Sequence, residues 1–176
     1  MIEIAIHGRG GQGAVTAARL LAEAAFMEGK HCQAFPTFGA ERRGAPVAAF
    51  VRLAEKPIRS RGLVYELDHV LVLDASLLDA IDVAQGLKQG GWLIVNSKKR
   101  PEKVKWDRIA WVDATRIANE VLGAPIVNTA MLGAFSKVTG IVRLESLVKT
   151  VEKYFHGKGA VGNVNAVRSA YEEVKT

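Results

Sequence analysis

Cysteine is almost absent from this sequence of 176 residues, because Cys32 is the only one. A lone thiol cannot form an internal disulfide, and by itself it cannot hold a zinc ion or an iron–sulfur cluster. We therefore expect this chain to carry no metal or cofactor of its own, and any redox metal to lie on another polypeptide.

Long apolar runs are also lacking. The longest stretch without a charged side chain, residues 121–136, has 16 residues, whereas a membrane-spanning helix needs about 20. Glu3, His7 and Arg9 interrupt the apolar beginning of the chain, which argues against a secretory signal. The sequence thus predicts a cytoplasmic protein that does not interact with a membrane.

Positive charge is in excess, and it is local. The chain has 24 Lys and Arg against 18 Asp and Glu, a net charge of +6. Residues 41–61 and 96–108 each contain six basic and two acidic side chains. Such runs are typical of solvated loops, of nucleic-acid binding, and of surfaces that meet small anions or acidic proteins. Within the second run Trp106 is the only aromatic residue, so charge is the sole argument for nucleic acid and we expect no nucleic-acid partner.

Short apolar runs alternate with segments of helical composition along the chain. Residues 2–7 have isoleucine at every second position, as in a strand. The run 70–73 is apolar throughout, as in a strand buried on both faces of a parallel sheet. Ser76 and Asp79 then resemble a capping box that starts a helix. The expected strands are 2–7, 45–53, 70–73, 92–95 and 109–112, and the expected helices are 14–28, 115–122, 129–138, 144–155 and 163–175.

This alternation predicts the α/β fold class, as a single Rossmann-like three-layer domain with a largely parallel central sheet. Hydrophobic residues make up 49% of the chain and charged residues 24%, which is ordinary for a globular protein. The length fits one domain, so we expect residues 1–176 to form it without a linker or a repeat.

A glycine-rich turn follows the first strand and opens the first helix. Residues 8–13 read Gly-Arg-Gly-Gly-Gln-Gly and match the pattern G-x-G-x-x-G. Glycines let the backbone turn tightly and approach a ligand, and free amides at a helix N-terminus attract an anion. A dinucleotide also needs an acidic residue near residues 32–35, and none is present there. Three alternatives stay open: bound NAD or FAD, a turn that only tightens packing, and contact with another anion or a partner.

Residues 35–46 form a second unusual loop, Phe-Pro-Thr-Phe-Gly-Ala-Glu-Arg-Arg-Gly-Ala-Pro. Stiff turns with paired guanidinium groups, here Arg42 and Arg43, suit the recognition of carboxylate or phosphate. Alternatively, Glu41 pairs with one of these arginines and the phenylalanines fill the core. Because specialised loops gather at one edge of an open α/β sheet, we expect this loop to lie at the same edge as residues 8–13.

No set of catalytic side chains stands out. His7, His31, His69 and His156 are scattered, without metal-ligand spacing or a neighbouring nucleophile motif, which favours structural roles. Asp74 ends a buried strand, where open α/β sheets bind ligands, but a carboxylate there also caps the backbone that follows.

The two loop motifs together carry a family resemblance. Residues 8–13 and 35–46 resemble the gamma subunit of the 2-oxoacid:ferredoxin oxidoreductases, most of all that of pyruvate:ferredoxin oxidoreductase (pyruvate synthase). The resemblance continues through 96–97, 113–115 and 123–133 and ends in the helix at 163–171, so it covers nearly the whole chain.

The resemblance implies one part of a larger enzyme. Such complexes oxidatively decarboxylate a 2-oxoacid, couple the acyl group to coenzyme A and pass electrons to ferredoxin. It implies alpha, beta and delta partner subunits, with thiamine diphosphate and Mg between alpha and beta and iron–sulfur clusters in beta and delta. The isolated chain is then expected to be inactive, with both loop motifs facing those subunits.

We also expect a contribution to coenzyme A binding. Coenzyme A carries a pyrophosphate and a 3′-phosphate and needs several cations or free amides. The alternative is that the same cations only pair with other subunits or lie in solvent. The candidate cofactor-contacting residues are Gly8, Arg9, Gly10, Gly11, Gln12, Gly13, Arg42, Arg43, Lys98, Asn128 and Thr129, and we expect no catalytic and no metal-binding residue.

A second functional hypothesis is a free-standing Rossmann-like nucleotide-binding domain or dehydrogenase. The missing ribose-binding acid and the missing set of catalytic residues favour the accessory subunit instead. Nothing in the residues indicates which 2-oxoacid is used, and pyruvate is favoured by resemblance alone.

Overall fold

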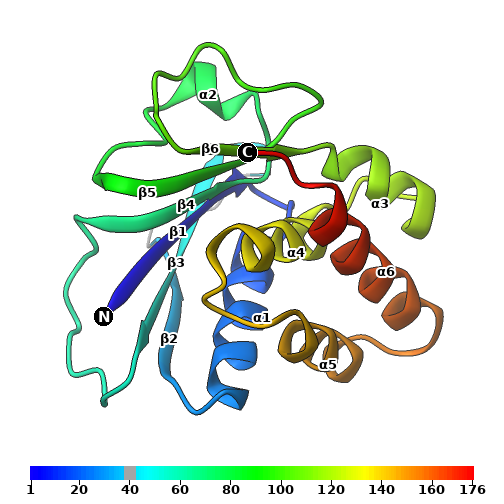
Figure 1. The fold of residues 1–176 in the computed structure, drawn as a ribbon, viewed down its shortest axis with the longest axis horizontal. Coiled ribbons are helices and arrows are strands. Elements are labelled where there is room, and N and C mark those ends of the chain that lie inside the picture. Colours follow the sequence, from blue (N-terminus) through cyan, green and yellow to red (C-terminus); the bar gives the residue numbers. More distant parts are fainter. Residues whose placement is uncertain (38–42) are drawn as a thin grey trace.

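A six-stranded sheet is the centre of the fold (Figure 1), and the computed structural model describes it within residues 1–37 and 43–176. The strands are β1 (Ile2–Arg9), β2 (His31–Pro36), β3 (Pro46–Ala54), β4 (Leu67–Val72), β5 (Leu87–Asn96) and β6 (Ile109–Val112). Their spatial order is β2-β3-β1-β4-β5-β6. β1 pairs in parallel with β4, β4 with β5 and β5 with β6, whereas β3 is antiparallel to β1 and β2. The prediction of a largely parallel sheet is confirmed.

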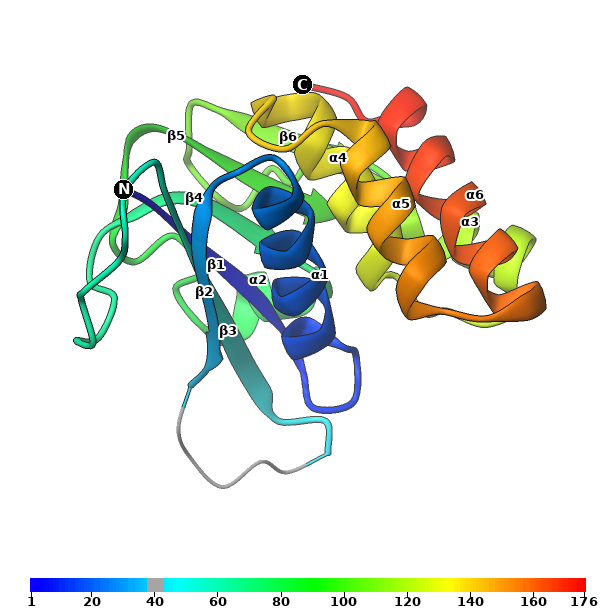
Figure 2. The same ribbon diagram turned by 90° about the horizontal axis from the view of Figure 1, so that it is seen from below.

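Three layers are also confirmed. Figures 1 and 2 show the longer helices gathered on one face of the sheet. They are α1 (Ala14–Met27), α3 (Ala114–Leu122), α4 (Asn128–Thr139), α5 (Leu144–Tyr154) and α6 (Gly157–Glu173). The one-turn helix α2 (Leu77–Ala80) and the segments connected to it cover the opposite face, where Leu77 and Val83 pack on the strands.

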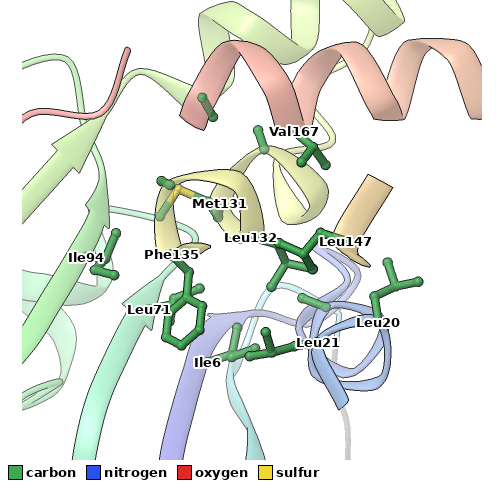
Figure 3. Packing of buried hydrophobic residues seen from close by; sticks show 14 of the residues in the cluster. Ile6, Leu20, Leu21, Leu71, Ile94, Met131, Leu132, Phe135, Leu147 and Val167 are labelled. Atoms are coloured by element: carbon green, nitrogen blue, oxygen red, sulfur yellow. The ribbon is translucent and has the colours of Figure 1, made fainter. Parts of the chain in front are cut away.

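The side chains of the central strands divide between two apolar clusters, because successive residues of a strand point to opposite faces. Ile6, Leu71 and Ile94 project toward the helices and meet Phe135 and Met131 of α4 (Figure 3). Their neighbours in sequence enter the cluster on the other face, which contains Ala5, Val70, Val72, Leu93 and Val95. Burial on both faces explains the continuous apolar run at 70–73.

Three elements differ most from their predictions. Strand β2 was not predicted, because its residues are half-buried at the sheet edge and show no clear alternation. Strand β5 begins five residues before position 92 and contains Gly91, whose missing side chain admits the backbone of Asp68. Helix α6 begins at Gly157 instead of 163. Its first turns are glycine-rich and weak in helix propensity, and Gly162 lets α6 approach Leu122 of α3.

The segment that follows α6 is tied to the edge strand β6, and the end of α6 is tied to α3. Beyond α6, Lys175 and Trp111 exchange two backbone hydrogen bonds of 2.9 Å, so the last residues add a short antiparallel bridge to the outer side of β6. Arg116 of α3 also pairs with Glu173 near the end of α6. These contacts fix the position of the carboxyl terminus.

None of the helices in the ranges 1–37 and 43–176 combines the length and the apolar character that crossing a membrane requires.

A close approach of two helices depends on one glycine. A Cβ atom at Gly133 of α4 would overlap the backbone carbonyl of Val167 on α6. Gly133→Ala should therefore destabilise the fold by at least about 2 kcal/mol, because backbone cannot move aside as a flexible side chain can. Thermal unfolding measures the effect. Gly159→Ala on α6 is the control, since open space surrounds Gly159, and it should be neutral or stabilising by up to about 1 kcal/mol. Equal melting temperatures for the two variants would contradict this packing.

Glu28 joins the end of α1 to the start of α5. One carboxylate oxygen accepts a 2.7 Å hydrogen bond from the backbone N–H of Arg143, and the other accepts one of 2.9 Å from Lys30. Only 7% of the Glu28 side chain is exposed. Burial alone would raise its pKa, but the hydrogen bonds from Lys30, Arg143 and Ser146 outweigh burial and lower the pKa to about 2.

Because its folded-state pKa is depressed, Glu28 stabilises the protein above its ordinary pKa of 4.5, and this contribution is lost as the pH falls through about 2. We expect Glu28→Gln to lower the free energy of unfolding by on the order of 2–3 kcal/mol at neutral pH, and to have no such effect near pH 2. Denaturant titrations at several pH values test this. The exposed Glu152→Gln on α5 should show no comparable pH dependence, and a cost for Glu28→Gln that is independent of pH would refute the ionic role.

Candidate functional site

A cleft of ≈ 780 Å³ opens at the carboxyl ends of the parallel strands. Chain segments leave the sheet at this edge after β4, β5 and β6, which is where open α/β sheets bind ligands. Polar side chains from several of these segments line the cleft: Gln12, Asp74, Asn96, Ser97, Lys98, Lys99, Asp113 and Thr115.

The glycine turn forms one end of this edge. Gly8 and Arg9 still belong to β1, and Gly13 precedes α1 with a φ of 81°. A Cβ atom at Gly13 would come within 2.5 Å of Nδ2 of Asn128, so a side chain is excluded here by both conformation and space. The turn therefore brings the N-terminus of α1 close to that of α4.

The second loop lies against the glycine turn, as predicted for the residues that the structure describes. The Gly10 N–H donates to the Ala45 carbonyl at 2.9 Å, and the Gly44 N–H donates to the Gly10 carbonyl at 3.1 Å. The backbone of Arg43 forms an isolated parallel β-bridge with that of Gly10. Arg42, the other predicted arginine, lies outside the described residues.

Arg9 is engaged by the protein itself. Its guanidinium donates to the hydroxyl of Ser76 at 2.8 and 3.1 Å and to the carbonyl of Gly44 at 3.0 Å, and Nε lies 3.5 Å from the Asp74 carboxylate. Arg9 thus clamps the second loop to the segment after β4. Three of its five N–H groups face protein acceptors, and a contact between Arg9 and an anion stays a prediction.

Gln12 and Asp74 complete this network. The Gln12 side chain accepts a 2.7 Å hydrogen bond from the Arg9 N–H and donates one of 2.8 Å to Asp74. Burial alone would raise the pKa of Asp74, but hydrogen bonds from Ser76 and Gln12 and the charge of Arg9 hold it below its ordinary value. Ser76 donates its hydroxyl to Asp74 and makes no cap to α2, so the predicted capping box is wrong.

The middle of the cleft is built on Asn96, at the end of β5. Its side-chain amide donates to the Leu73 carbonyl and to the Thr115 hydroxyl, both at 3.0 Å, and its oxygen accepts from the Thr115 N–H at 3.3 Å. Asn96 therefore ties β4, β5 and α3 together. It was missed as a site residue, although a buried apolar strand that ends in asparagine is a usable signal.

Lys98 and Lys99 bring positive charge to the rim of the cleft. Ser97 forms a tight turn with Lys99, donating its hydroxyl to the Lys99 carbonyl at 2.7 Å. In the part of the chain that the structure describes, neither lysine has an ion-pair partner. The acids of the cleft are engaged, because Asp74 meets Arg9 and Asp113 accepts from the Arg116 N–H at the start of α3.

The last two predicted contact residues lie behind the cleft. Asn128 is buried at the start of α4, and its Nδ2 lies 3.5 Å from the carbonyl oxygen of Gly13. Thr129 is fully buried, and its hydroxyl donates to Asn163 of α6 at 2.8 Å. Thr129 is therefore a helix-packing residue here and, unlike Lys98 and Gln12, has no surface facing the cleft.

The histidines and acidic residues of the described ranges form no arrangement that is typical of a catalytic or metal-binding site. Burial lowers the pKa of His7 to about 4, so this histidine stays neutral at physiological pH. His69 accepts the Trp92 N–H at 3.2 Å and serves the sheet. Between 1–37 and 43–176, no three His, Cys, Asp or Glu side chains gather as metal ligands would. Strand β2 also ends in Phe35 and Pro36, without the acid that a dinucleotide ribose requires.

Comparison with known proteins agrees with this geometry. Residues 3–173 match the family model described as pyruvate ferredoxin/flavodoxin oxidoreductase. The common subunit gamma of the pyruvate/ketoisovalerate oxidoreductases of Thermococcus litoralis is 56% identical, over 98% of this chain and 97% of the relative. The pyruvate synthase subunit PorC of Methanothermobacter thermautotrophicus is 54% identical, over 99% and 97%.

The fold is shared with a solved structure of the same kind. The crystal structure of the pyruvate oxidoreductase subunit PORC from Thermotoga maritima superimposes with a TM-score of 0.87, at 44% identity, over 99% of this chain and 97% of that one. Both loop motifs, the sheet and the helical layer fall inside the matched regions. The chain therefore belongs to the pyruvate ferredoxin/flavodoxin oxidoreductase family, as a gamma-type subunit of a multi-subunit oxidoreductase.

Proposed function

We propose that this chain is the non-catalytic gamma subunit of a 2-oxoacid:ferredoxin oxidoreductase and that its carboxyl-edge cleft binds the phosphate groups of coenzyme A in the assembled complex. The observation that supports the cleft most directly is the pair Lys98 and Lys99 on its rim, beside the glycine turn. Residues 1–176 act as one gamma-type domain in this proposal, in a cytoplasmic complex.

The overall reaction converts a 2-oxoacid and coenzyme A into an acyl-coenzyme A and carbon dioxide, with the electrons passing to oxidised ferredoxin. Thiamine diphosphate with Mg supplies the decarboxylation chemistry, and iron–sulfur clusters carry the electrons. The donor set described above fits neither group, since Cys32 is the single cysteine and no metal-ligand cluster occurs in the described ranges. We assign these groups to the alpha, beta and delta subunits.

The role left to this chain is to hold and orient the thioester-forming substrate. The pyrophosphate and 3′-phosphate of coenzyme A are multiply charged, and two lysines on a tight turn can pair with them as mobile point charges. The amide of Gln12, which donates one of its two N–H groups to Asp74, adds one neutral donor in the same cleft. The ion pair of Asp74 with Arg9 reduces the repulsion that this carboxylate would exert on such an anion.

Choice of the 2-oxoacid belongs to the other subunits in this proposal. The relative from Thermococcus litoralis is named a common subunit of pyruvate and ketoisovalerate oxidoreductases. A gamma chain that serves two enzymes with different 2-oxoacids cannot be what distinguishes these acids. We extend this reasoning to the present chain, with pyruvate as the favoured substrate.

A free-standing dinucleotide-binding enzyme is less well supported. Backbone groups of Gly10 are paired with Gly44 and Ala45, and Arg9 and Gln12 fill the space beside the turn with a closed network. The glycines therefore serve the close approach of two chain segments, where a dinucleotide would need open amides.

Removing the cleft lysines tests the proposal. Each charge-assisted contact with phosphate contributes about 1.5–3 kcal/mol, so Lys98→Ala and Lys99→Ala should each raise the KM for coenzyme A about tenfold or more. The KM for the 2-oxoacid should hardly change, because that substrate reacts on other subunits. Steady-state kinetics of the reconstituted complex measures both. Lys105→Ala, in the same basic run but outside the cleft lining, is the control, and an unchanged coenzyme A dependence in both cleft variants would overturn the assignment.

The purified chain alone should be inactive. We expect no oxidation of any 2-oxoacid with ferredoxin, no flavin absorbance and no bound iron, because the chain lacks the ligands for such groups. Activity should appear only after the other subunits are added. Metal analysis, absorbance spectra and activity assays of the isolated and reconstituted protein check this, and iron or 2-oxoacid-dependent NAD reduction in the isolated chain would contradict it.

A further inference from the structure

A second hollow lies at the β2 end of the sheet, on the face away from α1. Its volume is ≈ 440 Å³, and it lies between strands β2 and β3 and the connection from β3 to β4. Figure 2 shows this connection, in teal, on the opposite side of the strands from α1. We call the hollow the β2 groove and define it by Phe35, Phe50, Arg52, Leu63, Val64 and Tyr65.

Arg52 gives the β2 groove a fixed shape. Its side chain is buried, with a residue exposure of 2%, and Nε donates to the Glu3 carboxylate at 2.8 Å. From there Nη2 reaches the carbonyl of Gly62 at 2.7 Å, and the guanidinium lies 5.0 Å from the centre of the Phe35 ring. One buried cation therefore holds the β3–β4 connection against the sheet, so the β2 groove is formed before any partner binds.

The walls of the β2 groove are apolar and open to solvent. Leu63 is 68% exposed and Tyr65 is 76% exposed, although both face the half-buried ring pair Phe35 and Phe50, whose centres lie 5.8 Å apart. Large apolar side chains that gather around a hollow and remain exposed mark protein–protein contacts. Aromatic residues in particular are enriched at the centres of such contacts.

Charge on the same connection indicates what binds there. Lys56, Arg59 and Arg61 are exposed on this connection, which also carries the exposed acids Glu55 and Glu66, so residues 55–66 have a net charge of 3 − 2 = +1. In a symmetric contact between two copies, the same surface meets itself, and these basic groups would be brought together. An acidic surface instead complements them. The occupant is therefore a different chain that carries carboxylates around an apolar anchor.

We propose that the β2 groove docks another subunit of the same oxidoreductase, which inserts an apolar side chain between Phe35 and Leu63 and pairs its carboxylates with Arg59 and Arg61. The proposal rests on the proposed function only in taking the chain to work inside a multi-subunit complex. It does not involve the carboxyl-edge cleft or coenzyme A.

Purification of the complex through a tag on another subunit tests the docking. Leu63→Asp places a charge among the apolar walls, and Arg61→Glu reverses a charge on the rim. Each should reduce the amount of this chain retained with the complex after dilution by about tenfold or more. Val161→Asp on α6 is the control, because Val161 is 63% exposed and lies elsewhere, and it should be retained like the wild type. All three isolated chains should melt near the wild-type temperature, since the changes are at exposed positions.

The possible outcomes separate the two proposals. A wild-type chain that never co-purifies with the other subunits contradicts the proposed function itself. A wild type that co-purifies, with both groove variants retained as fully as Val161→Asp, overturns the groove proposal alone. Light scattering of the isolated chain gives a further check, because a dimer that Leu63→Asp dissociates would make a second copy the occupant and refute the hetero-subunit contact. If Leu63→Asp lowers the melting temperature of the isolated chain, the retention of Arg61→Glu with the complex decides the groove proposal, because Arg61 is exposed.

Discussion

Burial of the first nine residues of helix α4 is the constraint on which the rest of the structure depends. Every residue from Asn128 to Ser136 is buried, so this part of the helix has no face for solvent and must be enclosed on all sides. The sheet covers it through Ile6, Leu71 and Ile94, and α1, α5 and α6 cover the remaining sides. A helix that is apolar all round can exist only inside a larger assembly of elements. Its position in turn places Asn128 against Gly13 and brings Val127 to the wall of the cleft, so the core and the functional edge are set by the same helix.

A second lesson concerns the meaning of a glycine motif. The turn at residues 8–13 has the spacing of a dinucleotide-binding loop, yet its glycines admit chain segments of the protein itself: the backbone of Gly44 and Ala45 on one side and Asn128 on the other. The charged and polar residues between the glycines close the turn, because Arg9 and Gln12 bind each other, Asp74 and Ser76. In our proposal the anion binds two strands further along the sheet, at the loop after β5, where the lysines have no such partner among the described residues.

Much of the fold could be predicted from the sequence, because buried parallel strands and amphipathic helices leave strong periodic signals. The run 70–73 and the helix after residue 143 are of this kind. Strand β2 could not be predicted, since an edge strand with half-buried residues has no strict alternation, and the start of α6 is hidden by its glycines. For the site, charge and loop position indicated Lys98. The hydrogen bonds from Arg9 to Ser76 and Gly44 could not be predicted, because these partners lie 67 and 35 positions away in the chain. Thr129 stands next to Asn128 in sequence but faces α6, and only the helix register separates the two.

The bridge between Lys175 and Trp111 places the carboxyl terminus at the β6 side of the sheet, whereas the β2 groove lies at the opposite margin. With strands about 4.8 Å apart, the five steps from β6 to β2 amount to roughly 24 Å, close to the width of a small domain. A fluorophore or surface anchor attached after Thr176 thus emerges far from the groove and leaves it accessible. The same bridge occupies part of the outer hydrogen-bonding side of β6, whereas in the ranges 1–37 and 43–176 strand β2 pairs with β3 alone, so the two margins of the sheet differ.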